Sequence, residues 1–171
     1  MNVDEMKDFN NDGRLKVYLA GPFFNEEQLE RLQFIEALLS QMNYDVFSPM
    51  RASKIKSGAS HQDMVDTFNG NVTHIDEADF VLAILDGNDV GTVWETGYAY
   101  CAEIPVMYFN ETRPKEKGPN LMLAMSGGLP FIMNGEASTA RTKLTNVLKV
   151  IQEEGLNRLL DTNTNEFKEV E

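Results

Sequence analysis

The sequence predicts an α/β domain built on one parallel sheet of about five strands with helices on both faces. Two observations support this fold class. Short apolar runs alternate with stretches of helical periodicity, and the run from Phe80 to Leu85 is apolar throughout, as is typical of a central parallel strand. The length of 171 residues fits one domain. We expect that domain at residues 15–156, between a flexible polar leader at 1–14 and a polar acidic tail at 157–171.

Five short apolar runs predict the strands. The first ends at Gly21-Pro22, the second stops before Pro49, and the third is the fully apolar run already described. The fourth is also apolar, and the fifth has a weaker pattern. In order, the expected strands are residues 16–20, 45–48, 80–85, 104–109 and 130–133.

Apolar residues at helical spacing predict the helices between these strands. The first helix has Asn25 as its N-cap, with Gln28 in the position of a capping box. The second contains Asn69-Gly70, which predicts an interruption, and the third is expected to begin close to Thr92. The expected helices cover residues 25–42, 64–75, 92–103 and 136–154, and a mobile polar loop is expected at 51–60.

Composition and charge exclude several classes of partner. The chain has 15 Lys and Arg against 27 Asp and Glu, so its net charge of −12 repels nucleic-acid polymers and anionic membranes. No apolar run approaches the roughly 18–20 residues of a membrane span, and the first residues lack the pattern of a secretory signal. One cysteine and two histidines cannot form a disulfide or a zinc cage. We therefore expect a cytoplasmic protein that binds a small molecule of little charge.

Acidic residues after the central strand form the main candidate site. Ligands of open parallel sheets bind at the carboxyl ends of the strands, where the segment Asp86–Gly97 begins. Glu95 is expected near the first turn of the next helix, where the helix dipole keeps a carboxylate ionised and able to attack a sugar carbon. Asp89 would face the other side of the same ligand, and paired carboxylates suit glycosidic cleavage. The alternative is structural: Glu95 neutralises the helix N-terminus and Asp89 shapes the turn.

Three segments resemble the nucleoside 2-deoxyribosyltransferase family. They are Val17–Phe24, Asp89–Ala99 and Pro119–Met122, which occur in the family's order within about residues 15–134. The resemblance implies a Rossmann-like (flavodoxin-like) three-layer sandwich and a homo-oligomer, from dimer to hexamer, whose subunits share active sites. It also implies transfer of 2-deoxyribose between deoxynucleosides and free nucleobases without a cofactor or metal.

The same resemblance implies roles for individual residues. Glu95 is similar to the family's nucleophile, which forms a covalent deoxyribosyl intermediate, and Tyr18 to the tyrosine that orients it. Asp89 is similar to the acidic residue that assists the departing base. Asn71 stands where many bacterial members have an aspartate, and an asparagine cannot transfer a proton. The residues implied to bind substrate are Gly21, Phe24, Asn71, Gly91, Asn120 and Met122.

Two other functions stay open on the sequence. An N-glycosidase would use water in place of the acceptor base, on (deoxy)nucleosides or on nucleoside 5′-monophosphates. The loop Gly21–Asn25 has no Lys, Arg or Ser to hold a phosphate, but the candidates Ser48, Arg51, Ser53 and Ser126 lie elsewhere. A non-catalytic nucleotide-binding module would have no need of the nucleophile Glu95.

Three further residues have simpler interpretations. Cys101 is expected to be a small buried residue of its helix. His74 is expected to make a satisfied polar contact within a helix. Trp94 is expected to pack either in the core or at a contact between subunits.

Overall fold

The computed structural model describes residues 13–52 and 58–160. Its five strands form one parallel sheet of order β2-β1-β3-β4-β5, which confirms the predicted fold class. In chain order the elements are β1 (Lys16–Ala20), α1 (Glu26–Gln41), β2 (Asp45–Phe47), α2 (Pro49–Ala52), α3 (His61–Glu77), β3 (Phe80–Ile84), α4 (Val90–Cys101), β4 (Val106–Asn110), η1 (Lys115–Lys117), α5 (Leu121–Ser126), β5 (Gly128–Met133), α6 (Ala137–Glu154) and η2 (Leu156–Arg158).

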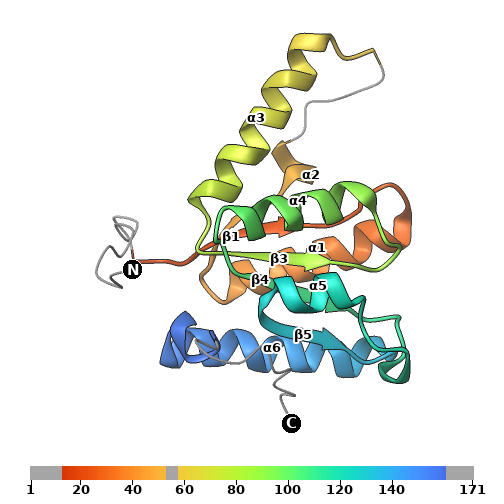
Figure 1. Ribbon diagram of the computed structural model, residues 1–171, viewed down its shortest axis with the longest axis vertical. Coiled ribbons are helices and arrows are strands. Elements are labelled where there is room, and N and C mark those ends of the chain that lie inside the picture. Colours follow the sequence, from red (N-terminus) through yellow and green to blue (C-terminus); the bar gives the residue numbers. More distant parts are fainter. Residues whose placement is uncertain (1–12, 53–57, 161–171) are drawn as a thin grey trace.

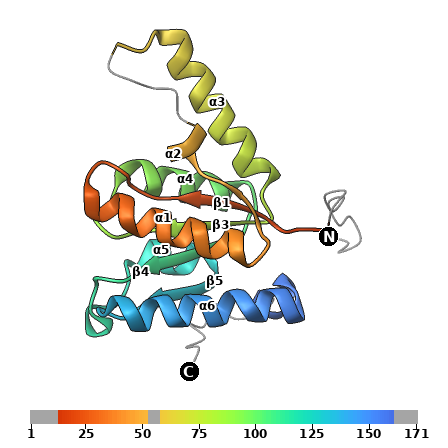
Figure 2. The same cartoon turned by 180° about the vertical axis from the view of Figure 1, so that it is seen from behind.

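Helices cover both faces of the sheet, so the domain has three layers (Figures 1 and 2). On one face, α1 and α6 pack against the sheet through a core rich in leucine, isoleucine and valine. On the other face, α3, α4 and α5 pack against β1, β3 and β4. Successive side chains of a strand point to opposite faces, so Leu19 lies in the first core and Tyr18 in the second. The half of α3 that starts at His61 extends beyond the sheet (Figure 1).

The helix after the central strand begins earlier than expected. Its first residue is Val90 and not Thr92, because Asp89 is the N-cap. The Asp89 carboxylate accepts hydrogen bonds from the backbone N–H of Thr92 at 2.7 Å and from its hydroxyl at 3.0 Å. This is the structural role left open for Asp89 in the sequence, and it satisfies a donor that the helix start would otherwise leave unpaired.

Other elements confirm or correct the sequence expectations. Asn25 caps α1 by accepting the Gln28 N–H at 2.9 Å, but the Gln28 side chain accepts the N–H of Phe24, so the capping box is not reciprocal. The Asn69-Gly70 pair does not interrupt α3, whose start has a complete capping box from Ser60. Helix packing outweighs the low helix propensity of those two residues.

The remaining differences lie at strand and loop boundaries. β4 starts after Pro105, which has no N–H to give to the sheet, and the pairing of β5 with β4 begins at Gly128. The short helix α2 starts before the loop expected at 51–60 and ends inside it, and residues 53–57 of that loop lie outside the described part of the chain. Most of the expected leader and tail lies outside it too. Cys101 is exposed, because α4 buries only a stripe on another side of the helix.

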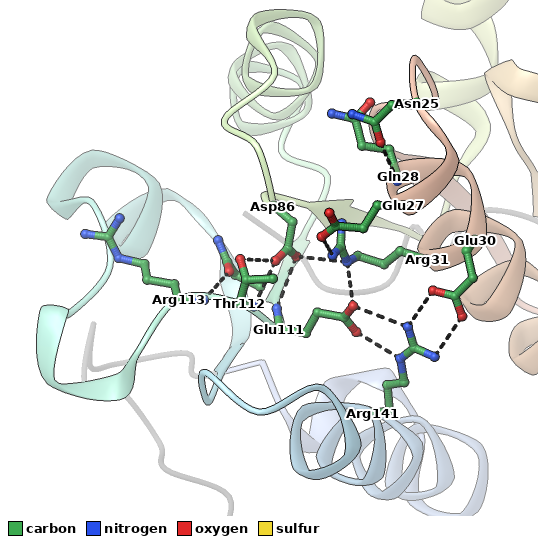
Figure 3. A network of polar contacts seen from close by, with 11 residues as sticks. Asn25, Glu27, Gln28, Glu30, Arg31, Asp86, Glu111, Thr112, Arg113 and Arg141 are labelled. Atoms are coloured by element: carbon green, nitrogen blue, oxygen red, sulfur yellow. Dashed lines mark hydrogen bonds and ion pairs between the residues drawn. The ribbon is translucent and has the colours of Figure 1, made fainter.

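A cluster of buried ion pairs joins α1 and α6 to the ends of β3 and β4 (Figure 3). Arg31 donates to Glu111 at 2.6 Å, and Arg141 donates to the same carboxylate at 2.9 and 3.2 Å. Arg141 also forms two bonds with Glu30. Asp86, 2% exposed, accepts the backbone N–H groups of Glu111 and Thr112. The cluster therefore holds together the loops that follow two neighbouring strands.

Candidate active site

The centre of the candidate site is a hydrogen bond between β1 and α4. The hydroxyl of Tyr18, a fully buried residue, donates to Oε1 of Glu95 at 2.6 Å. The two residues are 77 positions apart in the chain. They meet because β1 lies next to β3, and α4 crosses back over that face of the sheet directly after β3.

Burial controls the acidity of Glu95. It raises the pKa of the carboxyl to about 7, the Tyr18 hydrogen bond lowers it, and the negative charge of Asp89 raises it. This corrects the expectation that the helix dipole keeps Glu95 ionised. Because α4 starts at Val90, Glu95 lies in its second turn, and the dipole acts mainly within the first. The pKa of Tyr18 is raised far above its usual range, chiefly by burial, so Tyr18 is a permanent donor.

Asp89 lies close enough to Glu95 for its charge to act on that carboxyl. Only Oδ2 of Asp89 is used in capping α4, and among the described residues Oδ1 accepts no hydrogen bond. The turn before it contains Gly87 and Asn88, both with positive φ. Gly91, one of the residues implied to bind substrate, lies within α4, where an added Cβ would approach Oδ2 of Asp89 to 3.1 Å. Gly91 therefore leaves room for the capping carboxylate.

The other predicted site residues lie around the carboxyl edge of the sheet and on α3. Phe24 follows β1, is 74% exposed and stacks on Phe23, with ring centroids 5.3 Å apart. Asn120 caps α5, accepting the N–H of Met122 at 3.0 Å. Met122 is 76% exposed. Asn71 is half-buried on α3.

The structure thus brings Tyr18, Glu95 and Asp89 together, with Gly91 against the Asp89 carboxylate. Among the described residues, neither Asn71 nor Asn120 is hydrogen-bonded to this group. Gly21 packs closely against β3, since an added Cβ would lie 3.1 Å from the Ile84 side chain.

Two groups of contacts escaped sequence reasoning. One is the cluster of Arg31, Asp86, Glu111 and Arg141, whose members come from two helices and the loops after two strands (Figure 3). The other is Phe47 with His74, next to Tyr18. Only the alternation of side chains between the two faces of β2 could have indicated the face on which Phe47 lies. In residues 13–52 and 58–160, no group of three or more His, Cys, Asp or Glu could hold a metal ion.

A carboxylate held by a tyrosine near the carboxyl edge of a parallel sheet fits an α/β enzyme that uses an acidic side chain on its substrate. The family model described as nucleoside 2-deoxyribosyltransferase matches residues 17–127. The chain belongs to this family and is a pentosyltransferase.

Solved structures agree with this assignment. A 2-deoxyribosyltransferase of Bacillus psychrosaccharolyticus is 35% identical, with a TM-score of 0.61, over 68% of this chain and 85% of that one. Two further structures share the fold. A conserved protein of Enterococcus faecalis has 20% identity and a TM-score of 0.59 over 80% and 98% of the two chains. A CMP N-glycosidase of Clostridium botulinum has 18% identity and a TM-score of 0.55 over 75% and 96%.

A curated relative, an uncharacterised protein of Ureaplasma parvum, is 26% identical over 93 residues. The match covers 50% of this chain and 59% of that relative. None of the helices in the described ranges is long and apolar enough to cross a membrane.

Proposed function

We propose that this protein is a nucleoside 2-deoxyribosyltransferase that moves 2-deoxyribose from one nucleobase to another. The observation that carries the proposal is the 2.6 Å hydrogen bond from Tyr18 to Glu95, with Asp89 beside it. The substrates are a 2′-deoxynucleoside and a free nucleobase. Base exchange of this kind serves nucleoside salvage, and we place it in the cytoplasm.

In the first step, an ionised Glu95 attacks C1′ of the deoxynucleoside. The bond between a carboxylate oxygen and C1′ forms as the bond from C1′ to the base nitrogen breaks, and the electron pair leaves with the base. Tyr18 holds Oε1, so the other oxygen is available to attack. We assign Asp89, whose charge acts on Glu95, to assist the departing base, while Asn71 can hydrogen-bond to a base without transferring a proton.

In the second step, a nitrogen of the acceptor base attacks C1′, and the bond between C1′ and Glu95 breaks to restore the carboxylate. The acceptor nitrogen loses one proton to solvent, which balances the proton that the departed base takes up. Two displacements at the same carbon give net retention of configuration, as in retaining glycosidases. The absence of a 2′-hydroxyl makes the oxocarbenium-like transition state easier to reach. A pair of carboxylates and a tyrosine therefore supply the groups that this reaction needs.

We also propose that the active protein is a homo-oligomer with shared active sites. Met64 and Phe68 of α3 are 49% and 52% exposed, and Trp94 of α4 is 47% exposed. The Phe68 and Trp94 rings lie 5.3 Å apart, and Trp94 stacks on Tyr98 at 5.7 Å. Trp94 is expected from the sequence either in the core or at a subunit contact, and its exposure shows that it does not lie in the core. An exposed aromatic patch of this kind is typical of a subunit contact.

One assay tests the proposed reaction. The protein is incubated with a 2′-deoxynucleoside, with and without a different free base, and the products are separated by chromatography. We expect a new deoxynucleoside only when the acceptor base is present. Release of free deoxyribose at equal rates with and without the acceptor would establish the N-glycosidase instead, and binding without turnover would establish a binding module. Sedimentation at several concentrations tests the oligomer, and a fully active monomer would overturn it.

A further inference from the structure

Three aromatic rings form a continuous stack that ends at the proposed nucleophile. The ring of Tyr18 on β1 stacks on Phe47 of β2, with centroids 5.5 Å apart and planes 28° apart. The imidazole of His74 from α3 also stacks on Phe47, with centroids 3.6 Å apart and planes 15° apart. The hydroxyl of Tyr18 then donates to Glu95 on α4. The stack therefore connects α3 to Glu95 across the two strands β1 and β2.

The sheet register places the first two rings together. Tyr18 and Phe47 are direct partners of the parallel pair β1 and β2, so their side chains lie on the same face. Tyr18 is fully buried, and one side of its ring is covered by Phe47. Removing the Phe47 ring would leave space into which the phenol could tilt, because side chains hold their positions only through close packing.

The third ring is held by the helix backbone. Nδ1 of His74 lies 2.7 Å from the carbonyl oxygen of Gly70, one turn earlier in α3. A carbonyl only accepts, so Nδ1 carries the hydrogen and the ring has one orientation. The polar contact expected for His74 is thus confirmed. This hydrogen bond at the edge of the ring, together with Phe47 against its face, holds the His74 imidazole in place at the end of the stack.

We infer that Phe47 and His74 are positioning residues that hold the Tyr18 hydroxyl on Glu95. The inference rests on the proposed function for its kinetic consequences, since it acts on the proposed nucleophile. Asn71 lies three positions before His74, on the same side of α3. The helix that carries the residue proposed to contact the base therefore also braces the tyrosine that orients the nucleophile.

A purely structural stack would stabilise β2 without affecting Glu95, so the decisive measurement is made on Glu95 itself. The hydrogen bond from Tyr18 lowers the pKa of Glu95, and Asp89 is the nearby charge that raises it. If the stack positions the hydroxyl, Phe47→Leu and His74→Ala weaken this bond and raise the Glu95 pKa. The titration is followed by NMR on protein labelled with ¹³C at the glutamate carboxyls, and the Glu95 signal is assigned by its loss in Glu95→Gln.

Kinetics give a second measurement. We expect both variants to lower kcat/KM by about 2-fold to 10-fold at pH 7, because they weaken the bond from Tyr18 to Glu95 without removing it and so reduce the ionised fraction of Glu95. The acidic limb of the pH–activity profile should move to higher pH in both Phe47→Leu and His74→Ala. Phe47→Tyr keeps a ring in the stack and is expected to restore the wild-type pKa of Glu95.

Thr73→Ala is the matched control. Thr73 neighbours His74 on α3, and its hydroxyl donates to the Asn69 carbonyl at 2.9 Å, the same type of bond to the preceding turn. Thr73 is exposed and takes no part in the stack. Thr73→Ala should therefore leave both the pKa of Glu95 and the kinetic constants unchanged.

The outcomes separate the inference from the proposed function. Circular dichroism shows which variants fold. If Phe47→Leu does not fold, the test is made with His74→Ala, because His74 is only half-buried and its removal should disturb the core less. A folded variant with the wild-type pKa of Glu95 and an unmoved pH profile would overturn the positioning role. A wild-type protein that transfers no deoxyribose would overturn the proposed function, while the NMR titration would still decide whether the stack acts on Glu95.

Discussion

Replacing Tyr18 with phenylalanine removes one hydroxyl from the buried face of β1 and leaves the ring in its stack. That hydroxyl is the donor of a 2.6 Å bond to Glu95, and it lowers the pKa of the Glu95 carboxyl. A hydrogen bond to a charged group contributes roughly 1.5–3 kcal/mol. At 1.36 kcal/mol per pKa unit, its loss raises the pKa of Glu95 by about 1–2 units.

The effect on activity follows from the fraction of ionised Glu95. With a pKa of about 7, about half of the carboxyl groups are ionised at pH 7. In Tyr18→Phe this fraction falls to between roughly one in ten and one in a hundred. We therefore expect kcat/KM for deoxyribosyl transfer to fall by about 5-fold to 50-fold at pH 7, with most of the loss recovered near pH 9.

The assay measures kcat/KM for wild type and Tyr18→Phe between pH 5 and 9.5, limits that we set to bracket both acid limbs. Both proteins lose activity as the pH falls, and the variant should lose it at a higher pH. Tyr44→Phe is the control: this buried hydroxyl donates to the Leu148 carbonyl at 2.7 Å, far from Glu95 in the other core. An acid limb that stays in place in Tyr18→Phe, or an equal loss at every pH, would refute the reasoning.

Three further predictions concern Glu95 and Glu111. Glu95→Ala should abolish deoxyribosyl transfer in a protein that still folds. In the wild type, a 2′-fluoro-arabino deoxynucleoside should leave the mass of one sugar on the peptide that contains Glu95. An unchanged peptide mass during turnover, or a product with inverted configuration at C1′, would contradict double displacement. Burial raises the folded-state pKa of Glu95 to about 7, so the stability that this group contributes is lost as the pH rises from about 4.5 to 7. Glu95→Gln should therefore stabilise the protein at pH 8, by at most ~3 kcal/mol. It should have little effect at pH 5, and thermal melts at both pH values measure the difference. Glu111→Ala removes one of the three carboxylates that pair with the buried Arg31 and leaves Glu27 and Asp86 in place, so it should cost about 1.5–3 kcal/mol in denaturant unfolding. Glu154→Ala, which removes an exposed pair with Arg158, should cost under about 1 kcal/mol.

Much of the fold follows from patterns that act over a few residues. The apolar run of β3, the cap at Asn25 and the periodicity of α6 are local features, and the structure contains each of them. The same kind of pattern pointed to Asp89 and Glu95 after the central strand. Local patterns were weaker at boundaries, because the start of α4 depends on the capping bond from Thr92 to Asp89, which the spacing of apolar residues does not reveal.

Only the tertiary structure decided how the candidate site is arranged. Tyr18 reaches Glu95 across 77 positions, and Arg31 reaches Glu111 across 80. The stack of Phe47 and His74 on Tyr18 joins two strands and a helix. The sequence also suggested that the helix dipole governs the charge of Glu95, but burial sets its pKa. Desolvation and distant contacts depend on how sheet and helices pack, whereas strand and helix periodicity is written into each segment of the chain.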